Sequence, residues 1–146
     1  MTRVVVDASV VLASLMADGS TRGLLLGQHN LEFYAPEAVT TELRRHLDLV
    51  SERTGKSIDL VNALIEEVMA CLEAVPTPLF LAALPSARRR ARLARAYHDE
   101  AYVALADALG APIWTLDKDF RRMSGLKVLT TAEVKRLALP ATERSK

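Results

Sequence analysis

The chain has little cysteine and no long apolar segment, and both absences exclude classes of protein. Its one cysteine, Cys71, cannot form an internal disulfide or a cysteine-based zinc site. No segment reaches the roughly 18 consecutive apolar residues of a membrane-spanning helix. The apolar run after Arg3 is too short for a signal peptide. We therefore expect a cytoplasmic protein with no membrane partner.

An excess of one charge is also absent. Nineteen Lys and Arg stand against eighteen Asp and Glu, which excludes a polycation that binds nucleic acid by net charge alone but leaves room for a local basic patch. There are only six glycines, and none belongs to a Gly-rich loop followed by Lys and Ser or Thr, so nucleotide binding of that type is disfavoured. The three histidines lack the spacing of a zinc site.

The 146 residues, half of them apolar, predict one domain over residues 1–139 and a polar tail over 140–146. The β-branched run Val4–Val6 is typical of a strand that is covered on both faces. Further strands are expected at 31–35, 113–116 and 127–129, and helices at 21–28, 36–55, 57–75, 98–109 and 132–139. Helical sequence around Pro85 should be kinked or divided there. This alternation predicts an α/β fold with a central, mainly parallel sheet. Cys71 should be buried on the apolar face of the helix 57–75.

Four acidic residues lie where burial would be costly. Asp7 and Asp117 end two predicted strands, and ligands bind at the carboxyl ends of strands in open α/β sheets. Asp99 shares a helical face with Tyr102 and other apolar residues, and Glu42 borders a buried stripe. An ionised carboxylate is rarely buried without a partner.

Each acid also has a purely structural interpretation. Asp7 could cap the segment after it, Asp99 could be an acid favoured by a helix dipole, Asp117 could hold a turn, and Glu42 could pair with an arginine. A divalent cation would account for all four together, because Mg²⁺ and Mn²⁺ take oxygen ligands.

The acids and their neighbours resemble the PIN-domain nucleases, in a prokaryotic, VapC-like or related subgroup. The resemblance extends over about residues 3 to 130, and its motifs lie in four segments: Val4–Ser9, Pro36–Leu43, Asp99–Ala106 and Gly110–Phe120. It implies a three-layer α/β/α fold and metal-dependent cleavage of RNA phosphodiester bonds. Many members are toxins of toxin–antitoxin pairs and many are dimers, so the implied partners are an RNA substrate, an antitoxin protein and a second copy of the chain.

The resemblance also implies roles for individual residues. The quartet that would bind Mg²⁺ or Mn²⁺ is Asp7, Glu42, Asp99 and Asp117. Ser9 and Thr115 match small hydroxyl positions that hold the acids or the scissile phosphate. Asp119 supplies an additional acid, and either Asp117 or Asp119 could contact the metal directly; the strand favours Asp117. Whether one or two ions bind stays open.

Contacts to RNA need positive charge, and one segment concentrates it. Residues 74–98 contain no acid, and three arginines of this segment share a helical face upstream of Asp99: Arg88, Arg92 and Arg95. They form either a track for the RNA backbone, a solvated basic face or a docking surface for an acidic partner. Arg44 and Arg45, beside Glu42, are further RNA-binding candidates.

Other functions explain the residues less well. A phosphatase of the haloacid-dehalogenase type needs Asp-x-Asp after its first strand, but Asp7 is followed by Ala8 and Ser9. A receiver domain needs a pair of acids near the N-terminus, but the segment Arg3–Asp7 contains one. The main alternative is a non-catalytic PIN-like module that binds RNA or protein, and a nuclease assay with Mn²⁺ or Mg²⁺ distinguishes it from an enzyme.

Overall fold

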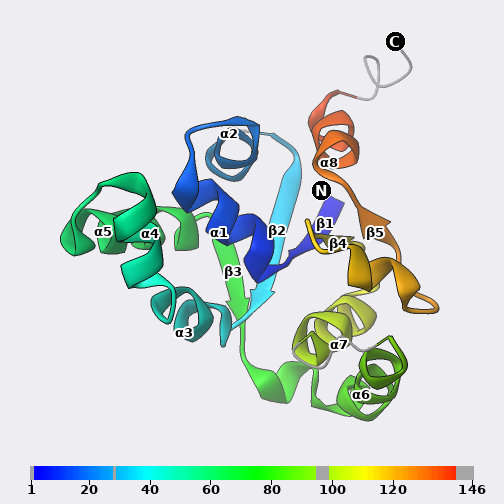
Figure 1. Ribbon diagram of the computed structural model, residues 1–146. Coiled ribbons are helices and arrows are strands. Elements are labelled where there is room, and N and C mark those ends of the chain that lie inside the picture. Colours follow the sequence, from blue (N-terminus) through cyan, green and yellow to red (C-terminus); the bar gives the residue numbers. More distant parts are fainter. Residues whose placement is uncertain (1, 28, 95–98, 141–146) are drawn as a thin grey trace.

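The computed structural model describes residues 2–27, 29–94 and 99–140. Its centre is a five-stranded sheet in the order β3-β2-β1-β4-β5, and every neighbouring pair of strands is parallel (Figure 1). The strands are β1 (Thr2–Val6), β2 (Leu31–Pro36), β3 (Leu72–Val75), β4 (Ile113–Trp114) and β5 (Val128–Leu129). The expected parallel α/β sheet is confirmed.

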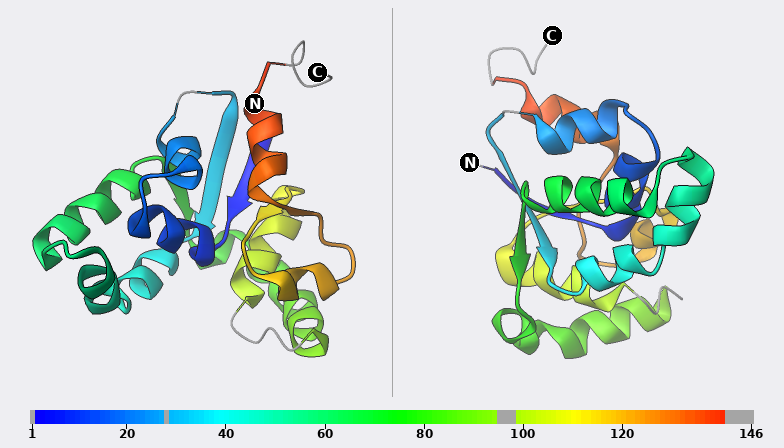
Figure 2. Two further views of the ribbon diagram at one scale, coloured as in Figure 1. Left: turned by 45° about the horizontal axis from the view of Figure 1, so that its top comes forward. Right: turned by 90° about the vertical axis from the view of Figure 1, so that its left-hand side faces the viewer.

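Helices cover both faces of this sheet, which confirms the three-layer arrangement. To one side lie α1, α2 and α5, and to the other lies α7, which packs against β1 and β2 and has α6 beyond it (Figure 2). The α-helices are α1 (Ala8–Met16), α2 (Ser20–Leu26), α3 (Val39–Arg44), α4 (Leu47–Thr54), α5 (Ile58–Met69), α6 (Leu84–Leu93), α7 (Glu100–Leu109) and α8 (Thr131–Ala138). Short 3-10 turns are η1 (Thr77–Leu79), η2 (Leu81–Ala83) and η3 (Lys118–Arg122). None of the described helices is long and apolar enough to cross a membrane.

The core forms where β1 lies between β2 and β4. Val4, Val5 and Val6 are completely buried, as their unbroken β-branched run predicts. Trp114 of β4 is also fully buried, and its indole N–H donates a hydrogen bond of 3.1 Å to the hydroxyl of Thr131. This bond satisfies the one polar atom of the largest core side chain and fixes the start of α8 against β4.

Helix ends follow local signals closely. The Ser57 side chain accepts a hydrogen bond from the backbone N–H of Leu60 and so begins α5. Gly55 and Gly110 follow α4 and α7 in the left-handed conformation that favours glycine, as expected for helix stops. Pro85 lies in the first turn of α6, so it begins this helix and separates it from η1 and η2.

The structure corrects two expected helices. The helix 57–75 ends at Met69, and residues 72–75 instead form β3 at the edge of the sheet, paired with β2. Cys71 lies between these elements and is exposed, so its predicted burial was wrong. The helix 36–55 is two helices, α3 and α4, and Pro36 ends β2 instead of opening a helix. His98, Gln28 and residues 141–146, which bore on other expected boundaries, lie outside the described residues.

Candidate functional site

The strand order changes direction between the neighbouring strands β1 and β4, and the acidic residues lie near the carboxyl ends of these two strands. β1 continues to β2 and β3 on one side, while β4 and β5 lie on the other. Asp7 follows β1 directly and Asp117 comes after β4. Such a switch point leaves a crevice outside the strand ends, which is where open α/β sheets bind ligands.

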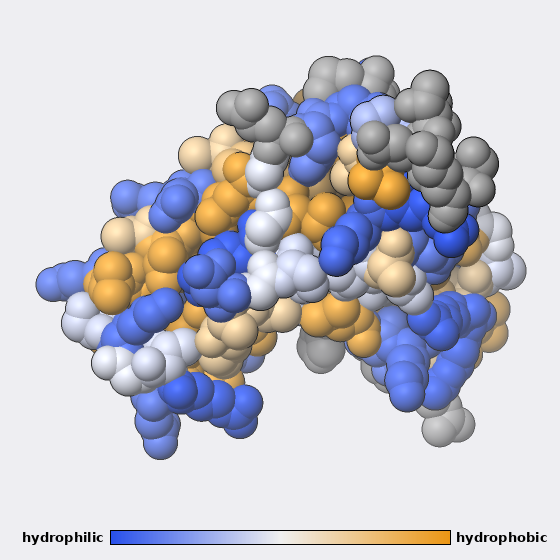
Figure 3. Space-filling view, turned by 90° about the horizontal axis from the view of Figure 1, so that it is seen from above, coloured by the Kyte–Doolittle hydropathy of each residue, from blue (hydrophilic) through white to orange (hydrophobic). Residues whose placement is uncertain are grey.

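The molecule is visibly hollowed on one side, between two lobes with many hydrophilic residues (Figure 3). One lobe contains α3, α4 and α5, and the other contains α6, α7 and the segment from β4 to β5 (Figure 1). Glu42 comes from α3, and Asp99 immediately precedes α7. The two remaining acids of the predicted quartet are thus supplied from opposite lobes.

Asp7 is buried, with 4% of its surface exposed, and two hydroxyls hold its carboxylate. The Ser9 hydroxyl donates to Oδ2 of Asp7 at 2.6 Å, and the Thr115 hydroxyl donates to the same oxygen at 2.8 Å. Burial raises the pKa of Asp7, and these hydrogen bonds oppose the rise because they stabilise the charged form. The backbone N–H of Leu116 donates to the Ser9 hydroxyl at 3.1 Å, which fixes Ser9 in place.

Asp117 and Asp119 are part of the tight turn that follows β4. The backbone N–H of Asp117 donates to the Thr115 hydroxyl at 3.0 Å, and that of Asp119 donates to Oδ1 of Asp117 at 2.9 Å. Asp117 therefore does hold a turn, as its structural interpretation proposed. The Asp119 carboxylate lies 3.2 Å from the guanidinium of Arg122, so part of its charge is compensated within η3.

Glu42 has a partner that sequence reasoning missed. The hydroxyl of Tyr102, on α7, donates a hydrogen bond of 3.1 Å to Oε1 of Glu42. Tyr102 is 1% exposed, which confirms its expected core position, yet the tip of its side chain reaches the acidic site. Burial, followed by the negative charge of Glu42, raises the pKa of Tyr102, so its hydroxyl stays protonated and remains a donor. The spacing of Tyr102 from Asp99 on one helical face was the only signal that could have indicated this.

Asp99 shows that the acids act on one another. Its pKa is raised to about 7, first because it is partly buried and then because of the negative charges of Asp7, Asp117, Glu42 and Asp119. Asp99 is the residue at the N-terminal end of α7, where a helix dipole favours an acid, but its side chain makes no capping hydrogen bond. We refer to these five residues as the acidic cluster. The sequence-based expectation that acids from separate elements meet at one place is consistent with this geometry.

Comparison with known proteins identifies the family. The family model described as the PIN domain matches residues 5–138. The chain belongs to the PIN-domain family. No curated protein matches the sequence. PIN domains are generally nucleases that use divalent metal ions.

Two solved structures share the PIN fold at low sequence identity. The crystal structure of VapBC2 from Rickettsia felis, bound to a DNA fragment from their promoter, has a TM-score of 0.69 and 13% identity, and the match covers 88% of this chain and 98% of that one. PAE2754 from Pyrobaculum aerophilum has a TM-score of 0.65 and 18% identity, covering 94% and 90% of the two chains. At such identities the likeness shows the fold.

The donor atoms of this PIN domain suit a hard cation. Within the described residues, no three Asp, Glu, His or Cys side chains already form a ready metal site. The polar side-chain atoms that converge are carboxylate and hydroxyl oxygens, which Mg²⁺ and Mn²⁺ prefer. Burial and, after it, the negative charges of the other acids raise the pKa of Asp99, and a bound divalent cation would offset these charges. The chemistry of the donor atoms therefore fits such an ion.

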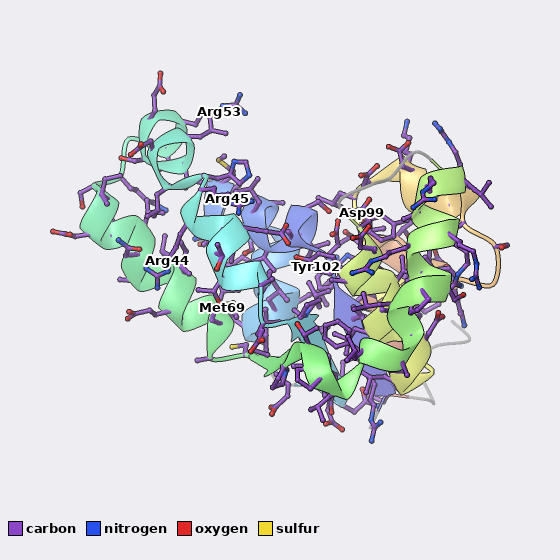
Figure 4. The ribbon with its side chains drawn as sticks, turned by 90° about the horizontal axis from the view of Figure 1, so that it is seen from below. Arg44, Arg45, Arg53, Met69, Asp99 and Tyr102 are labelled. Carbon is purple, nitrogen blue, oxygen red and sulfur yellow. The ribbon has the colours of Figure 1, made fainter. Side chains whose placement is uncertain are left out.

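Some of the arginines predicted to bind RNA contact other residues of the protein, and others are exposed with no such contact among the residues that the structure describes. Arg88 lies 3.8 Å from Glu100, and the Arg44 guanidinium donates to Oδ1 of Asn62 at 3.3 Å. Arg92 and Arg45 are exposed, and Arg95 lies outside the described residues. Figure 4 shows Arg45 on the α3 side of the hollow, and Asp99 and Tyr102 on the α7 side.

Arg90 has a role that the sequence did not indicate. Its guanidinium pairs with Asp107 of α7 and donates at 3.0 Å to the backbone carbonyl of Ser124, just after η3. Arg90 therefore ties α6 to α7 and to the segment that carries Asp117 and Asp119. Because Arg90 is one of several arginines close together in the sequence, the sequence does not distinguish it from those that are exposed to solvent.

Proposed function

We propose that this PIN-domain protein is a metal-dependent ribonuclease that hydrolyses RNA phosphodiester bonds with Mg²⁺ or Mn²⁺. The observation that carries the proposal is the link between Asp7 and Asp117 through the Thr115 hydroxyl at the ends of β1 and β4. The pKa of Asp99 supports it, because burial and, after it, the negative charges of the four other acids all raise this pKa. A cluster of this kind is unfavourable without a cation, and its presence favours a site built for one.

The proposed roles follow from where each residue lies. Asp7, Glu42, Asp99 and Asp117 would ligate the metal or orient the attacking water, and Asp119 would assist from the same turn. When bound, the ion would polarise a phosphoryl oxygen and lower the pKa of a coordinated water. Ser9 and Thr115 hold Asp7 in a single orientation, and Tyr102 does the same for Glu42. Such bonds orient ligands and keep the site ready for substrate.

A cleavage assay tests the proposal directly. The intact protein is incubated with structured and unstructured RNA in Mn²⁺ or Mg²⁺, with and without chelator, and with DNA of the same sequence for comparison. We expect cleavage of RNA that the chelator abolishes. Asp7→Asn and Asp99→Asn should keep the fold and reduce the rate by about 100-fold or more, because each removes a ligand charge.

The matched control is Asp59→Asn on α5, which removes a carboxylate that the site does not use. It should cleave at the rate of the intact protein. Full metal-dependent activity in both Asp7→Asn and Asp99→Asn would contradict the assignment of the acidic cluster. A folded protein that binds RNA and never cuts it would favour the alternative of a non-catalytic binding module.

We also propose that the biological role is that of a toxin in a toxin–antitoxin pair. The fold shared with VapBC2 supports this role. The test is whether expression of the chain arrests growth and whether the product of the neighbouring gene relieves the arrest. Growth arrest by Asp99→Asn equal to that of the intact chain would separate toxicity from the acidic cluster.

A further inference from the structure

A pocket of about 540 Å³ opens beside the acidic cluster, at the corner where α3 meets α4. Its lining comes from one short stretch of chain: Ala38, Thr41, Glu42, Arg45 and His46. Glu42 belongs to both the pocket and the acidic cluster. A molecule that occupies the pocket therefore lies next to the proposed site of cleavage.

Arg45 places a positive charge in the pocket, opposite in sign to Glu42 and the other acids of the neighbouring site. Arg45 and His46 are both exposed, and Arg45 forms no ion pair with any residue that the structure describes. Arg45 is three residues from Glu42, a spacing that allows an ion pair within a helix, yet these two side chains do not form one. The guanidinium of Arg45 is thus available to an anion from outside the protein.

Arg92 is exposed like Arg45, but three other arginines are less available. Arg44 is engaged with Asn62, Arg88 lies near Glu100, and Arg90 is held by Asp107 and the carbonyl of Ser124. Among the described arginines of α6, fewer guanidinium groups are therefore free to bind an RNA backbone than the sequence suggests. Arg45 combines an available charge with a cavity that reaches the acids.

Resting on the proposed ribonuclease function, we infer that this pocket binds the nucleotide next to the scissile phosphodiester of a single-stranded RNA. Arg45 binds its phosphate, since a guanidinium matches phosphate geometry. The Thr41 hydroxyl is a further donor, and the imidazole of His46 offers a face on which the base stacks. The volume is within the range of pockets that hold small ligands and is larger than one phosphate needs, so it has room for a base as well.

The experiment measures binding separately from cleavage. A short fluorescein-labelled oligouridylate is titrated with the intact protein in Ca²⁺, its integrity is checked on a gel, and anisotropy is recorded over a range of salt concentrations. Arg45→Gln should weaken binding about ten-fold, because a hydrogen-bonded charge contact to phosphate is lost. The slope of log affinity against log salt should fall in magnitude by about 0.7, as expected for one fewer phosphate contact to a single strand.

Two further variants serve as controls. Arg136→Gln removes the same charge from α8, outside the pocket, and should bind within about two-fold of the intact protein, as a surface substitution that removes no contact. Arg45→Lys keeps the charge and should retain the salt slope while losing part of the affinity. If Arg45→Gln binds RNA with unchanged affinity and slope, or if the intact protein does not bind the oligouridylate, the inference is wrong.

The stacking part has its own test. His46→Ala should weaken binding about ten-fold and His46→Phe should restore it, since stacking on an aromatic ring is worth about 1–3 kcal/mol per base. An oligonucleotide made entirely of abasic units should bind His46→Ala and the intact protein equally. A loss of affinity for this abasic strand in His46→Ala would contradict stacking.

The two proposals can fail separately. Binding that depends on Arg45, with no cleavage in Mg²⁺ or Mn²⁺, would support the pocket and overturn the nuclease function. Metal-dependent cleavage with the same KM in Arg45→Gln and the intact protein would support the nuclease function and overturn the pocket.

Discussion

The Thr115 hydroxyl lies 2.8 Å from Oδ2 of Asp7, although 108 residues separate the two along the chain. The same hydroxyl accepts a hydrogen bond from the backbone N–H of Asp117. One side-chain oxygen therefore connects the acid that follows β1 to the acid that follows β4. The same contact joins the ends of the two neighbouring strands and holds two of the proposed metal ligands near each other.

Thr115→Val should weaken both stability and activity. Valine keeps the shape of threonine but removes the donor, so the buried carboxylate of Asp7 loses a partner at a cost of about 1–3 kcal/mol in the free energy of unfolding. Urea denaturation measures this loss, and the rate of RNA cleavage should fall as well. Thr77→Val in η1 is the control, because Thr77 is exposed, and it should change stability by no more than about 0.5 kcal/mol. Unchanged stability and activity in Thr115→Val would show that Ser9 alone holds Asp7.

Tyr102→Phe should lower kcat about ten-fold and leave KM nearly unchanged. The substitution keeps the buried ring and removes only the hydroxyl that orients Glu42, and partners of this kind commonly matter by about 10–100-fold. The concentration of Mn²⁺ needed for half-maximal activity should rise too, which a purely structural role would not cause. Tyr34→Phe is a matched control, since the Tyr34 hydroxyl donates to Glu32 away from the cluster. A normal Mn²⁺ dependence in Tyr102→Phe would rule out this positioning role.

The metal-free protein should become less stable as the pH rises from about 4 to about 7. Asp99 has a pKa of about 7 when folded and 3.8 as the reference value, so in this range the folded state binds a proton that the unfolded state does not. The free energy of unfolding then falls with pH and becomes level above about pH 7. Because Asp99 is partly exposed, solvent screening limits the change to about 1–2 kcal/mol.

Urea denaturation in chelator across this range measures the slope. Asp99→Asn should remove most of it and stabilise the metal-free protein at about pH 8, whereas Asp59→Asn should retain it. A slope that persists in Asp99→Asn would mean that another group is responsible.

Addition of Mn²⁺ should stabilise the intact protein more at about pH 8 than at about pH 5. A cation binds the ionised cluster, and at low pH it must compete with the proton on Asp99. Ligand binding to the folded state raises the free energy of unfolding according to its affinity, so thermal unfolding with increasing Mn²⁺ reports it. The shift should be lost in Asp7→Asn. Equal stabilisation of Asp7→Asn and the intact protein would place the cation elsewhere.

Arg90→Met should loosen the segment after β4 without unfolding the protein. Methionine fills similar space but loses the pair with Asp107 and the bond to the carbonyl of Ser124, which we expect to cost about 1–2 kcal/mol. Hydrogen exchange should accelerate at the amides of residues 118–126. The neighbouring Arg89→Met, at an exposed position of α6, is the control. Unchanged exchange in Arg90→Met would show that the segment is held by its buried side chains, Phe120 and Met123, without Arg90.

Much of the fold could be predicted because local and tertiary preferences agree. Val4–Val6 is both β-branched and fully buried, and Gly55 and Gly110 end helices in a conformation that glycine adopts easily. β3 was missed because Leu72 and Val75 are three residues apart, a spacing that also fits a helix. Only pairing with β2, which the local sequence does not encode, decides between the two structures.

The residues of the candidate site also differ in whether their positions could be predicted from the sequence. The positions of Asp7 and Asp117 follow from the rule that strand ends meet at one edge of the sheet, and their roles as ligands stay a prediction. The bond from Tyr102 to Glu42 depends on where α7 lies relative to α3, and the pairing of Arg90 with Asp107 depends on how α7 packs against α6. Contacts between helices that are distant in sequence depend on side-chain reach, which periodicity does not report.

The order of the strands has a consequence for the protein during its own synthesis. β1 is synthesised well before its neighbour β4 and the turn with Asp117, because β2, β3 and several helices lie between them in the chain. A nascent chain that stops before residue 117 can pair β1 with β2 but lacks an acid from the far side of the sheet. Under the proposed function, such an incomplete translation product would not cleave the messenger RNA from which it is made, because it lacks one of the proposed metal ligands.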